Sequence, residues 1–144
     1  DDYPVTDDPD LLSTAEDLRA AVGDFVRRVL VHHSLPQGQA AALGYLERTG
    51  PLSIAELARL EQVKHQSMAR TVGLLKAQEL VDVHAAETDR RQVVVTITEA
   101  GAERIADVRQ RRASNIARTL AEDLDDEERE IVGRIPGILR KLQP

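Results

Sequence analysis

The chain has 144 residues and a formal net charge of −6; 42% of its residues are hydrophobic, 2% are aromatic and none is cysteine. This length accommodates one domain with an aliphatic core, and the lack of cysteine excludes disulfides, thiolate zinc sites and thiol redox sensing. No apolar stretch approaches the roughly 20 residues that cross a bilayer and no signal peptide is visible, so we expect a cytoplasmic protein.

The charge is distributed unevenly along the chain. Residues 1–24 and 122–130 are rich in aspartate and glutamate, whereas residues 62–78 contain lysine and arginine but no acid. Electrostatic interaction between a charged side chain and a phosphate is screened beyond about 10 Å at physiological salt. The charge of the nearby surface, and not the net charge of the protein, therefore decides whether a phosphate is attracted. A nucleic-acid-binding face on an acidic protein is therefore compatible with the net charge.

The N-terminal region predicts a flexible acidic arm over residues 1–9 and a long helix over about 10–33. Ser13 with Glu16 fits a capping box at its start, and Asp10 is a competing N-cap. The apolar residues of this helix recur at a heptad-like spacing, at Leu11, Ala15, Leu18, Val22, Phe25 and Val29. Such a stripe is typical of a helix that packs on a long partner helix, in the same chain or in a dimer, and we predict a homodimer.

Three helices are predicted between residues 37 and 79. The first ends at Gly50-Pro51, and the second begins at Ser53, which forms a capping box with Glu56. A turn over 61–63 leads to the third, and two short helices joined in this way form a helix-turn-helix. The residues predicted to face the core from the second and third helices are Ile54, Leu57, Ala58, Leu60, Val63, Met68, Val72 and Leu75.

Two β-rich runs, LVDVH and QVVVTIT, predict a hairpin after the helix-turn-helix. The residues that share one face of its second strand are Val93, Val95 and Ile97. Thr98 is placed to cap the next helix, over about 99–122, and Asp125 with Glu128 predicts the start of a last one. We expect a kink or a break at Pro136, because proline lacks the amide hydrogen.

The segment SIAELARLEQVKHQSMARTVGLLKAQELV, followed by TDRRQVVVTITEAG, resembles the MarR family of bacterial transcription regulators. The resemblance is most specific at Asp89-Arg90-Arg91, Thr98 and Gly101, which match that family's D-R-R and L-T-x-x-G pattern. It implies a mainly helical fold with a small β-hairpin wing, a winged helix-turn-helix. The implied parts of one domain over 10–144 are a DNA-binding lobe over about 37–98 and dimerisation helices over about 10–33 and 99–143.

The function that the resemblance implies is that of a homodimeric transcription repressor, which binds an inverted-repeat operator and responds to a small, often aromatic or phenolic, effector. The effector would bind between the dimerisation helices and the DNA-binding lobe. Its possible pocket residues are Phe25, His32, His33 and Tyr45. The two histidines could instead hold a metal ion or an anion, or only complement the helix dipole; we expect no metal and no cofactor.

The residue types of the helix-turn-helix suit DNA on chemical grounds. The N-terminal residues of a recognition helix read base edges in the major groove, where glutamine pairs with adenine and arginine with guanine or phosphate. Serine and lysine at helix N-termini suit phosphate contacts. The residues predicted to contact DNA here are Ser53, Lys64, His65, Gln66, Ser67 and Arg70.

Adjacent arginines at a hairpin tip suit the minor groove, whose negative potential attracts arginine. We predict that Arg90 and Arg91 share the roles of DNA contact and wing brace, and the sequence leaves open which residue has which role. Asp89 is predicted to be structural, through backbone amides or by pairing with Arg91, because phosphate repels it.

Three features depart from the family pattern. Glu79 stands where the family has glycine before the first wing strand, which predicts a turn of different shape. Asp82-Val83-His84 occupies a stretch where family members often carry arginine, which predicts a weaker non-specific attraction to phosphate. Pro136 would disturb the dimer packing of the terminal helices.

A winged-helix module that binds proteins rather than DNA is the alternative, and it would expose large apolar residues on the recognition helix. The residues predicted to point outward there are not of that kind: His65, Gln66, Ala69, Arg70 and Gly73. No acid–base cluster or nucleophile motif is recognisable, so we expect no enzyme activity. Neither the target promoter nor the choice between activation and repression follows from the sequence.

Overall fold

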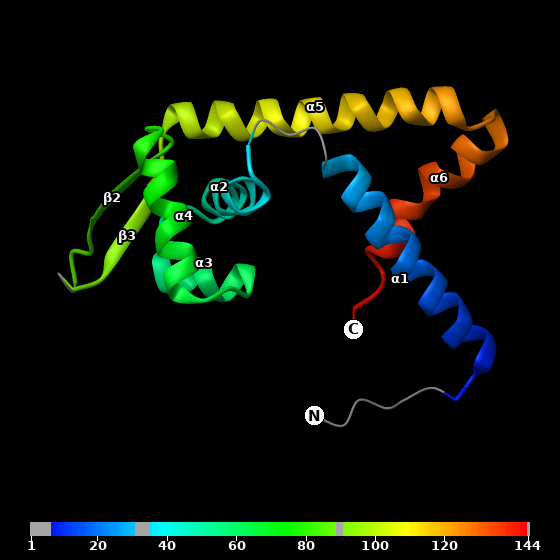
Figure 1. The fold of residues 1–144 in the computed structure, drawn as a ribbon, viewed down its shortest axis with the longest axis horizontal. Helices are drawn as coiled ribbons and strands as arrows, with labels where there is room; N and C mark the ends of the chain where they lie inside the picture. The colour runs from blue at the N-terminus through cyan, green and yellow to red at the C-terminus, as the bar shows by residue number, and fades with distance from the viewer. Residues whose placement is uncertain (1–6, 31–34, 89–90, 144) are drawn as a thin grey trace. The chain divides into compact units, whose positions relative to one another are not determined.

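The computed structural model (Figure 1) describes residues 7–30, 35–88 and 91–143 and is mostly helical, with one small antiparallel sheet. Its elements are α1 (Pro9–Leu30), α2 (Gln37–Thr49), β1 (Leu52–Ser53), α3 (Ile54–Glu61), α4 (His65–Ala77), β2 (Val81–Ala85), β3 (Val93–Ile97), α5 (Glu99–Asp123) and α6 (Asp126–Leu139). The chain divides into two compact units, Asp1–His33 and Ser34–Pro144, which are described separately. Within the residues that the structure describes, no helix is long and apolar enough to cross a membrane.

Helix α1 makes up the described part of the first unit, and its cap differs from the prediction. Oδ1 of Asp8 accepts hydrogen bonds from the backbone N–H groups of Asp10 (3.0 Å) and Leu11 (3.3 Å). Asp8 is therefore the N-cap, and Pro9 takes the first helical position, where an N–H has no helical partner to lose. The predicted caps Asp10 and Ser13 are wrong, because both residues lie inside the helix.

The hydrophobic core lies in the second unit. Helix α2 has the predicted bounds and ends at Gly50, whose φ of 89° is one that glycine adopts without strain. The largest fully buried side chains are Leu35, Leu43, Leu46, Leu57, Met68, Leu75, Val81 and Val95. Because α2, α3, α4 and both hairpin strands contribute to this set, one core holds the helix-turn-helix against the hairpin.

The helix-turn-helix formed by α3 and α4 begins with the predicted capping box. Oγ of Ser53 accepts from the N–H of Glu56 at 3.1 Å, and Oε1 of Glu56 accepts from the N–H of Ser53 at 3.3 Å. The chain then turns at Gln62, which has a left-handed φ of 58°. The N–H of Val63 donates to the carbonyl of Ala58 and closes the end of α3.

Two residues predicted to be in the core lie on the surface instead. Leu60 is 46% exposed and Val63 is 40% exposed. Leu60 lies in the last turn of α3, one residue before its end, and Val63 belongs to the turn that follows, where the helical period no longer applies. The other predicted core residues of the recognition helix are buried: Met68, Val72 and Leu75.

The wing belongs to a three-stranded sheet in the order β1-β3-β2. Strands β2 and β3 pair antiparallel along their full lengths, as the hairpin prediction requires. Strand β1, in which Leu52 pairs with Val95, was not predicted, because two residues are too few to show an alternating pattern. Val95 is buried, whereas Val93 on the same face is exposed near the tip of the hairpin.

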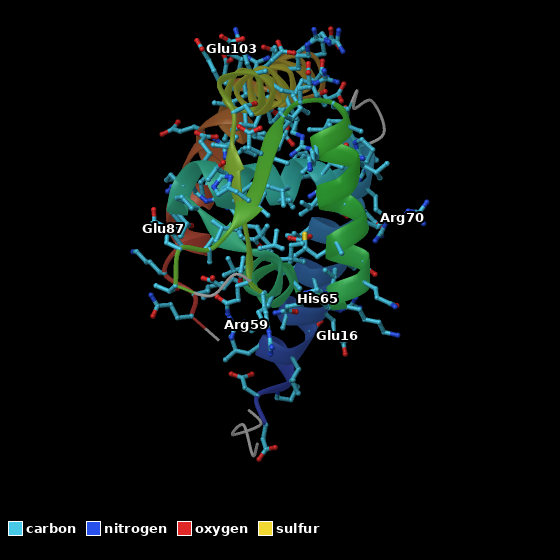
Figure 2. All side chains as sticks on the ribbon, turned by 90° about the vertical axis from the view of Figure 1, so that its left-hand side faces the viewer. Glu16, Arg59, His65, Arg70, Glu87 and Glu103 are labelled. Atoms are coloured by element: carbon cyan, nitrogen blue, oxygen red, sulfur yellow. The ribbon has the colours of Figure 1, made fainter. Side chains whose placement is uncertain are left out.

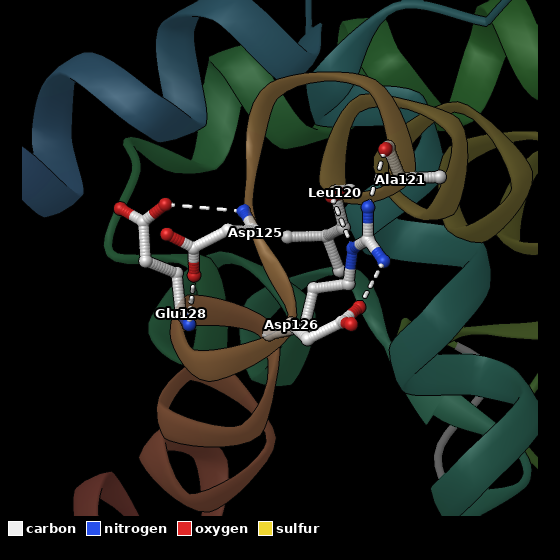
Figure 3. Close-up of polar contacts among 6 residues, drawn as sticks. Leu120, Ala121, Asp125, Asp126 and Glu128 are labelled. Atoms are coloured by element: carbon white, nitrogen blue, oxygen red, sulfur yellow. Dashed lines mark hydrogen bonds and ion pairs between the residues drawn. The ribbon is translucent and has the colours of Figure 1, made fainter.

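Helices α5 and α6 meet at a corner that backbone and side-chain hydrogen bonds hold (Figure 3). The capping box of Asp125 with Glu128 opens α6 as predicted. Arg129 reaches back to α5 and donates to the carbonyls of Leu120 (3.1 Å) and Ala121 (2.7 Å). It satisfies carbonyl groups that the end of a helix leaves without intrahelical partners.

The predicted break at Pro136 does not occur. Helix α6 runs through this proline to Leu139, and the N–H of Arg140 donates to the Pro136 carbonyl. Proline removes one donor from the ladder and strains the turn before it, but α6 ends soon afterwards and the helix accommodates it.

Candidate nucleic-acid interface

Helix α4 presents its N-terminal end to solvent. Lys64 is the N-cap and makes no side-chain capping hydrogen bond, and the three residues after it are exposed: His65, Gln66 and Ser67. The first backbone N–H groups of a helix have no partner within the helix, and the positive end of the helix dipole lies there. This end of α4 is therefore suited to an anion such as a phosphate.

The outward face of α4 continues with Arg70. Figure 2 shows the Arg70 side chain reaching away from the protein, and His65 at the N-terminal end of the same helix. None of the ion pairs formed in the described part of the chain includes Arg70. Gln66 and Arg70 are four residues apart and share a face, so both can reach one groove. Ala69, predicted to point outward, is half-buried.

Ser53 lies at the N-terminus of α3 and is half-buried. Its hydroxyl oxygen already accepts a hydrogen bond from the backbone N–H of Glu56. The hydroxyl group can still donate a hydrogen bond to a phosphate oxygen. The carboxylate of Glu56 completes the capping box and brings negative charge next to Ser53. Ser53 is consequently less suited to a phosphate than the first turn of α4.

The described part of the wing carries charges of both signs. Arg91 and Glu87 are exposed on either side of the tip, and Asp82 and His84 are exposed on β2. Asp89 and Arg90 lie outside the described residues. The predicted division of roles between the two arginines, and the structural role of Asp89, therefore stay predictions.

A brace at the base of the wing was only partly foreseen. Oγ1 of Thr98 accepts from the N–H of Gly101 (3.0 Å), the predicted cap, and also donates to the carbonyl of Glu79 (2.8 Å). A Cβ at Gly101 would lie 2.1 Å from the carbonyl oxygen of Leu80. Threonine and glycine of the L-T-x-x-G pattern thus hold the start of α5 against the turn between α4 and β2. The pattern marked both residues, but their contacts with 79 and 80 needed the structure.

Comparison with known proteins shows which family these elements resemble. Residues 33–92 match the model of the MarR family. This segment contains the helix-turn-helix and the first strand of the wing. A relative from Pseudomonas putida, named the HTH-type transcriptional repressor NicR, is 33% identical over 101 residues, which cover 62% of this chain and 64% of that protein. The match therefore spans slightly less than two thirds of the relative.

Solved structures share the fold of this chain. A MarR family protein from Bacillus stearothermophilus superimposes with a TM-score of 0.72 at 21% identity, over 95% of this chain and 97% of that one. BpsR from Bordetella bronchiseptica superimposes with a TM-score of 0.61 at 24% identity, over 90% of this chain and 97% of that one. The DNA binding of that protein is regulated by 6-hydroxynicotinic acid. The predicted fold, mainly helical with a winged helix-turn-helix, is confirmed.

The position where the MarR family resemblance led us to expect glycine is strained in this chain. Glu79 has a φ of 61°, in the left-handed region that glycine adopts freely and that costs other residues about 1 kcal/mol. Its N–H donates to the Lys76 carbonyl, and the N–H of Leu80 donates to that of Leu75, which closes the end of α4. Glu79 therefore occupies this position at the cost of backbone strain, at the point where the chain enters the wing.

The residues predicted to line an effector pocket of MarR type belong to both units of the chain, and that pocket stays a prediction. Tyr45 is half-buried, its hydroxyl donates to the Leu60 carbonyl at 3.1 Å, and the Arg48 guanidinium lies 5.3 Å from its ring centroid. These contacts give it a structural role. Phe25 is exposed on α1, in the other unit. His32 and His33 lie outside the residues described.

A cluster of arginines marks the contact between α2 and α5. Arg109 pairs with Glu47 at 2.7 Å, and Arg112 donates to Oε1 of Gln37 at 3.1 Å. The Nε of Arg112 is buried without a hydrogen-bond partner in the described structure. Burial lowers the pKa of Arg112 from its usual value, and the charge of Arg109 lowers it further. These arginines belong to helix packing and not to the outward face of α4.

Proposed function

We propose that this protein is a cytoplasmic, sequence-specific DNA-binding transcription regulator of MarR type that acts as a repressor. The observation that carries the proposal is the exposed N-terminus of α4, without a side-chain cap, followed by an outward face with Arg70 and no acid between residues 62 and 78. Repression is supported by the relative from Pseudomonas putida, which is named a repressor.

Each part of the interface has a proposed contact. Gln66 and Arg70 reach base edges in the major groove, where a bidentate pair discriminates against a wrong base by about 1–3 kcal/mol. The residues proposed to contact phosphate are Ser53, Lys64, His65 and Ser67. Arg90 and Arg91 place the wing in the adjacent minor groove, with Asp89 as its brace.

The alternative function, a protein-binding module, has one observation in its favour. Leu74 on α4 is 45% exposed, and Leu60 and Val63 are exposed at the turn. Leu74 follows Arg70 by one helical turn and shares its face, however. An apolar side chain in that position can contact thymine methyl groups in the major groove, so it does not count against DNA.

A homodimer is proposed because the terminal helices leave apolar side chains exposed. These residues include Leu11, Leu18, Val22, Phe25, Ile131, Ile135, Ile138 and Leu142. A second copy would cover them and would set two recognition helices about 34 Å apart, one turn of DNA, as an inverted repeat requires. Light scattering should give a mass near twice 15.9 kDa at micromolar concentration. A monomer that binds DNA tightly would contradict the dimer.

We also propose that a small aromatic or phenolic effector regulates DNA binding. The support is the structural neighbour BpsR, whose DNA binding is regulated by 6-hydroxynicotinic acid. That compound, used as the probe, should raise the thermal midpoint and release bound DNA if an effector of this class is accepted. If it and a panel of phenolic acids change neither the midpoint nor DNA binding, the effector proposal is wrong and DNA binding is untouched.

DNA binding is tested by selecting duplexes from a random-sequence pool on the purified protein and measuring their affinity by fluorescence anisotropy. Arg70→Ala should weaken binding to the selected duplex about 10- to 100-fold, with a smaller loss on random duplex. Arg118→Ala is the matched control, because Arg118 is an exposed arginine on α5, outside the helix-turn-helix. If no duplex is enriched over the starting pool, the proposed function is wrong.

The wing is tested by the double substitution Arg90→Ala, Arg91→Ala. We expect it to remove most of the affinity for the selected duplex while the circular dichroism spectrum stays unchanged. The slope of log K against log salt should also fall by about 0.9 for each phosphate contact that is lost. Normal affinity in this variant would show that the wing stays outside the DNA.

A further inference from the structure

Gly73 is a glycine for which the folded chain provides no reason. It lies in the interior of α4, is exposed, and is not among the residues with a positive φ. A Cβ built on it would meet nothing within 4 Å. Glycine weakens a helix relative to alanine, because it loses more backbone freedom on folding. Alanine at this position would therefore strengthen α4 without any clash inside the protein.

Other glycines of the second unit show what an internal reason looks like. A Cβ at Gly101 would overlap the Leu80 carbonyl oxygen, and one at Gly44 would lie 3.3 Å from a guanidinium nitrogen of Arg48. Gly50 has a φ of 89° that favours glycine. Gly73 meets none of these conditions, which is also true of Gly38, Gly133 and Gly137, so any constraint on it has to come from its own place on the surface.

The position of Gly73 on α4 indicates what that constraint is. It follows Gln66 by two helical turns and Arg70 by about one, so all three lie on the outward face. The buried side of the helix is formed by Met68, Val72 and Leu75. A partner read by Gln66 and Arg70 therefore passes directly over Gly73.

We propose that Gly73 is the point at which the backbone of α4 comes into van der Waals contact with DNA, so that the missing side chain sets how deeply the helix enters the major groove. This inference rests on the proposed DNA-binding function. Hydrogen bonds from Gln66 and Arg70 to base edges need donor–acceptor distances near 2.7–3.2 Å. A methyl group at residue 73 holds the helix away and lengthens those bonds, so Gly73 is a positioning residue for base readout.

The test is Gly73→Ala, in which stability and binding should change in opposite directions. The thermal midpoint should rise by about 2–4 °C. Affinity for the duplex selected on the unmodified protein should fall about tenfold or more, as when one base contact is lost. Affinity for random duplex, which depends on phosphate, should change much less.

Gly133→Ala is the matched control, because Gly133 is an exposed helical glycine of α6 whose Cβ would also meet nothing within 4 Å. It should leave the midpoint unchanged or raise it, and it should leave the affinity unchanged. Unchanged affinity in Gly73→Ala, while Arg70→Ala still weakens binding, overturns the inference and leaves the proposed function standing. A lowered midpoint in Gly73→Ala also overturns it, because the space around residue 73 would then serve the fold.

Discussion

The winged lobe and the corner formed by α5 and α6 are stabilised in different ways, although both belong to the second unit. In the lobe, leucine and valine side chains from α2, α3, α4 and the hairpin are fully buried within one chain. In α5 the buried residues lie only in its first half, at Gly101, Ile105 and Val108, and none lies in α6. The lobe can therefore fold on its own contacts, whereas α6 has an apolar face that needs a second surface.

The comparison is tested most strongly by truncating one apolar side chain in each region. Leu43→Ala, in the lobe core, should lower the free energy of unfolding by about 2–5 kcal/mol at any protein concentration. Ile138→Ala, at an exposed position of α6, should change it by less than about 0.5 kcal/mol at concentrations where the protein is monomeric. Denaturant unfolding at several concentrations measures both. A large loss for Ile138→Ala in the monomer would mean that α6 is buried in the single chain.

Glycine substitutions sharpen the same comparison. Gly101→Ala should cost about 2–3 kcal/mol, because its Cβ would lie 2.1 Å from a backbone oxygen that cannot easily move. Gly133→Ala, in the open surroundings of α6, should be neutral or stabilising by up to about 1 kcal/mol. Equal losses in the two variants would contradict the close approach of α5 to the backbone of Leu80.

Loss of the two capping boxes should destabilise different parts of the protein. Ser53→Ala removes a cap from the lobe and should lower the free energy of global unfolding by about 1 kcal/mol. Asp125→Ala removes the equivalent cap of α6, and we expect a similar loss confined to local opening of that helix. Amide hydrogen exchange separates the cases: Asp125→Ala should speed exchange in α6 only. Faster exchange throughout the lobe would show that corner and lobe unfold together.

A feature of these regions could be predicted from the sequence when the residues that form it are close together in the chain. Capping boxes at Ser53 and Asp125 and the hairpin were predictable, because each depends on residues close together in the chain. Strand β1 and the exposure of Leu60 were not, because they depend on where distant segments meet. At the interface the sequence indicated which face of α4 is outward. It could not show that the space over Gly73 is empty.

The smallest predicted effect concerns the junction between the recognition helix and the wing. Glu79→Gly should stabilise the lobe by about 0.5 kcal/mol, because relief of the left-handed strain slightly exceeds the extra freedom that glycine gives the unfolded chain. Ala77→Gly, at the last helical residue of α4, is the control and should cost up to about 1 kcal/mol. Opposite signs in thermal unfolding would assign the strain to residue 79. A loss in Glu79→Gly would instead mean that the Glu79 side chain contributes more than its backbone strain costs, and the wing would then depend on this glutamate.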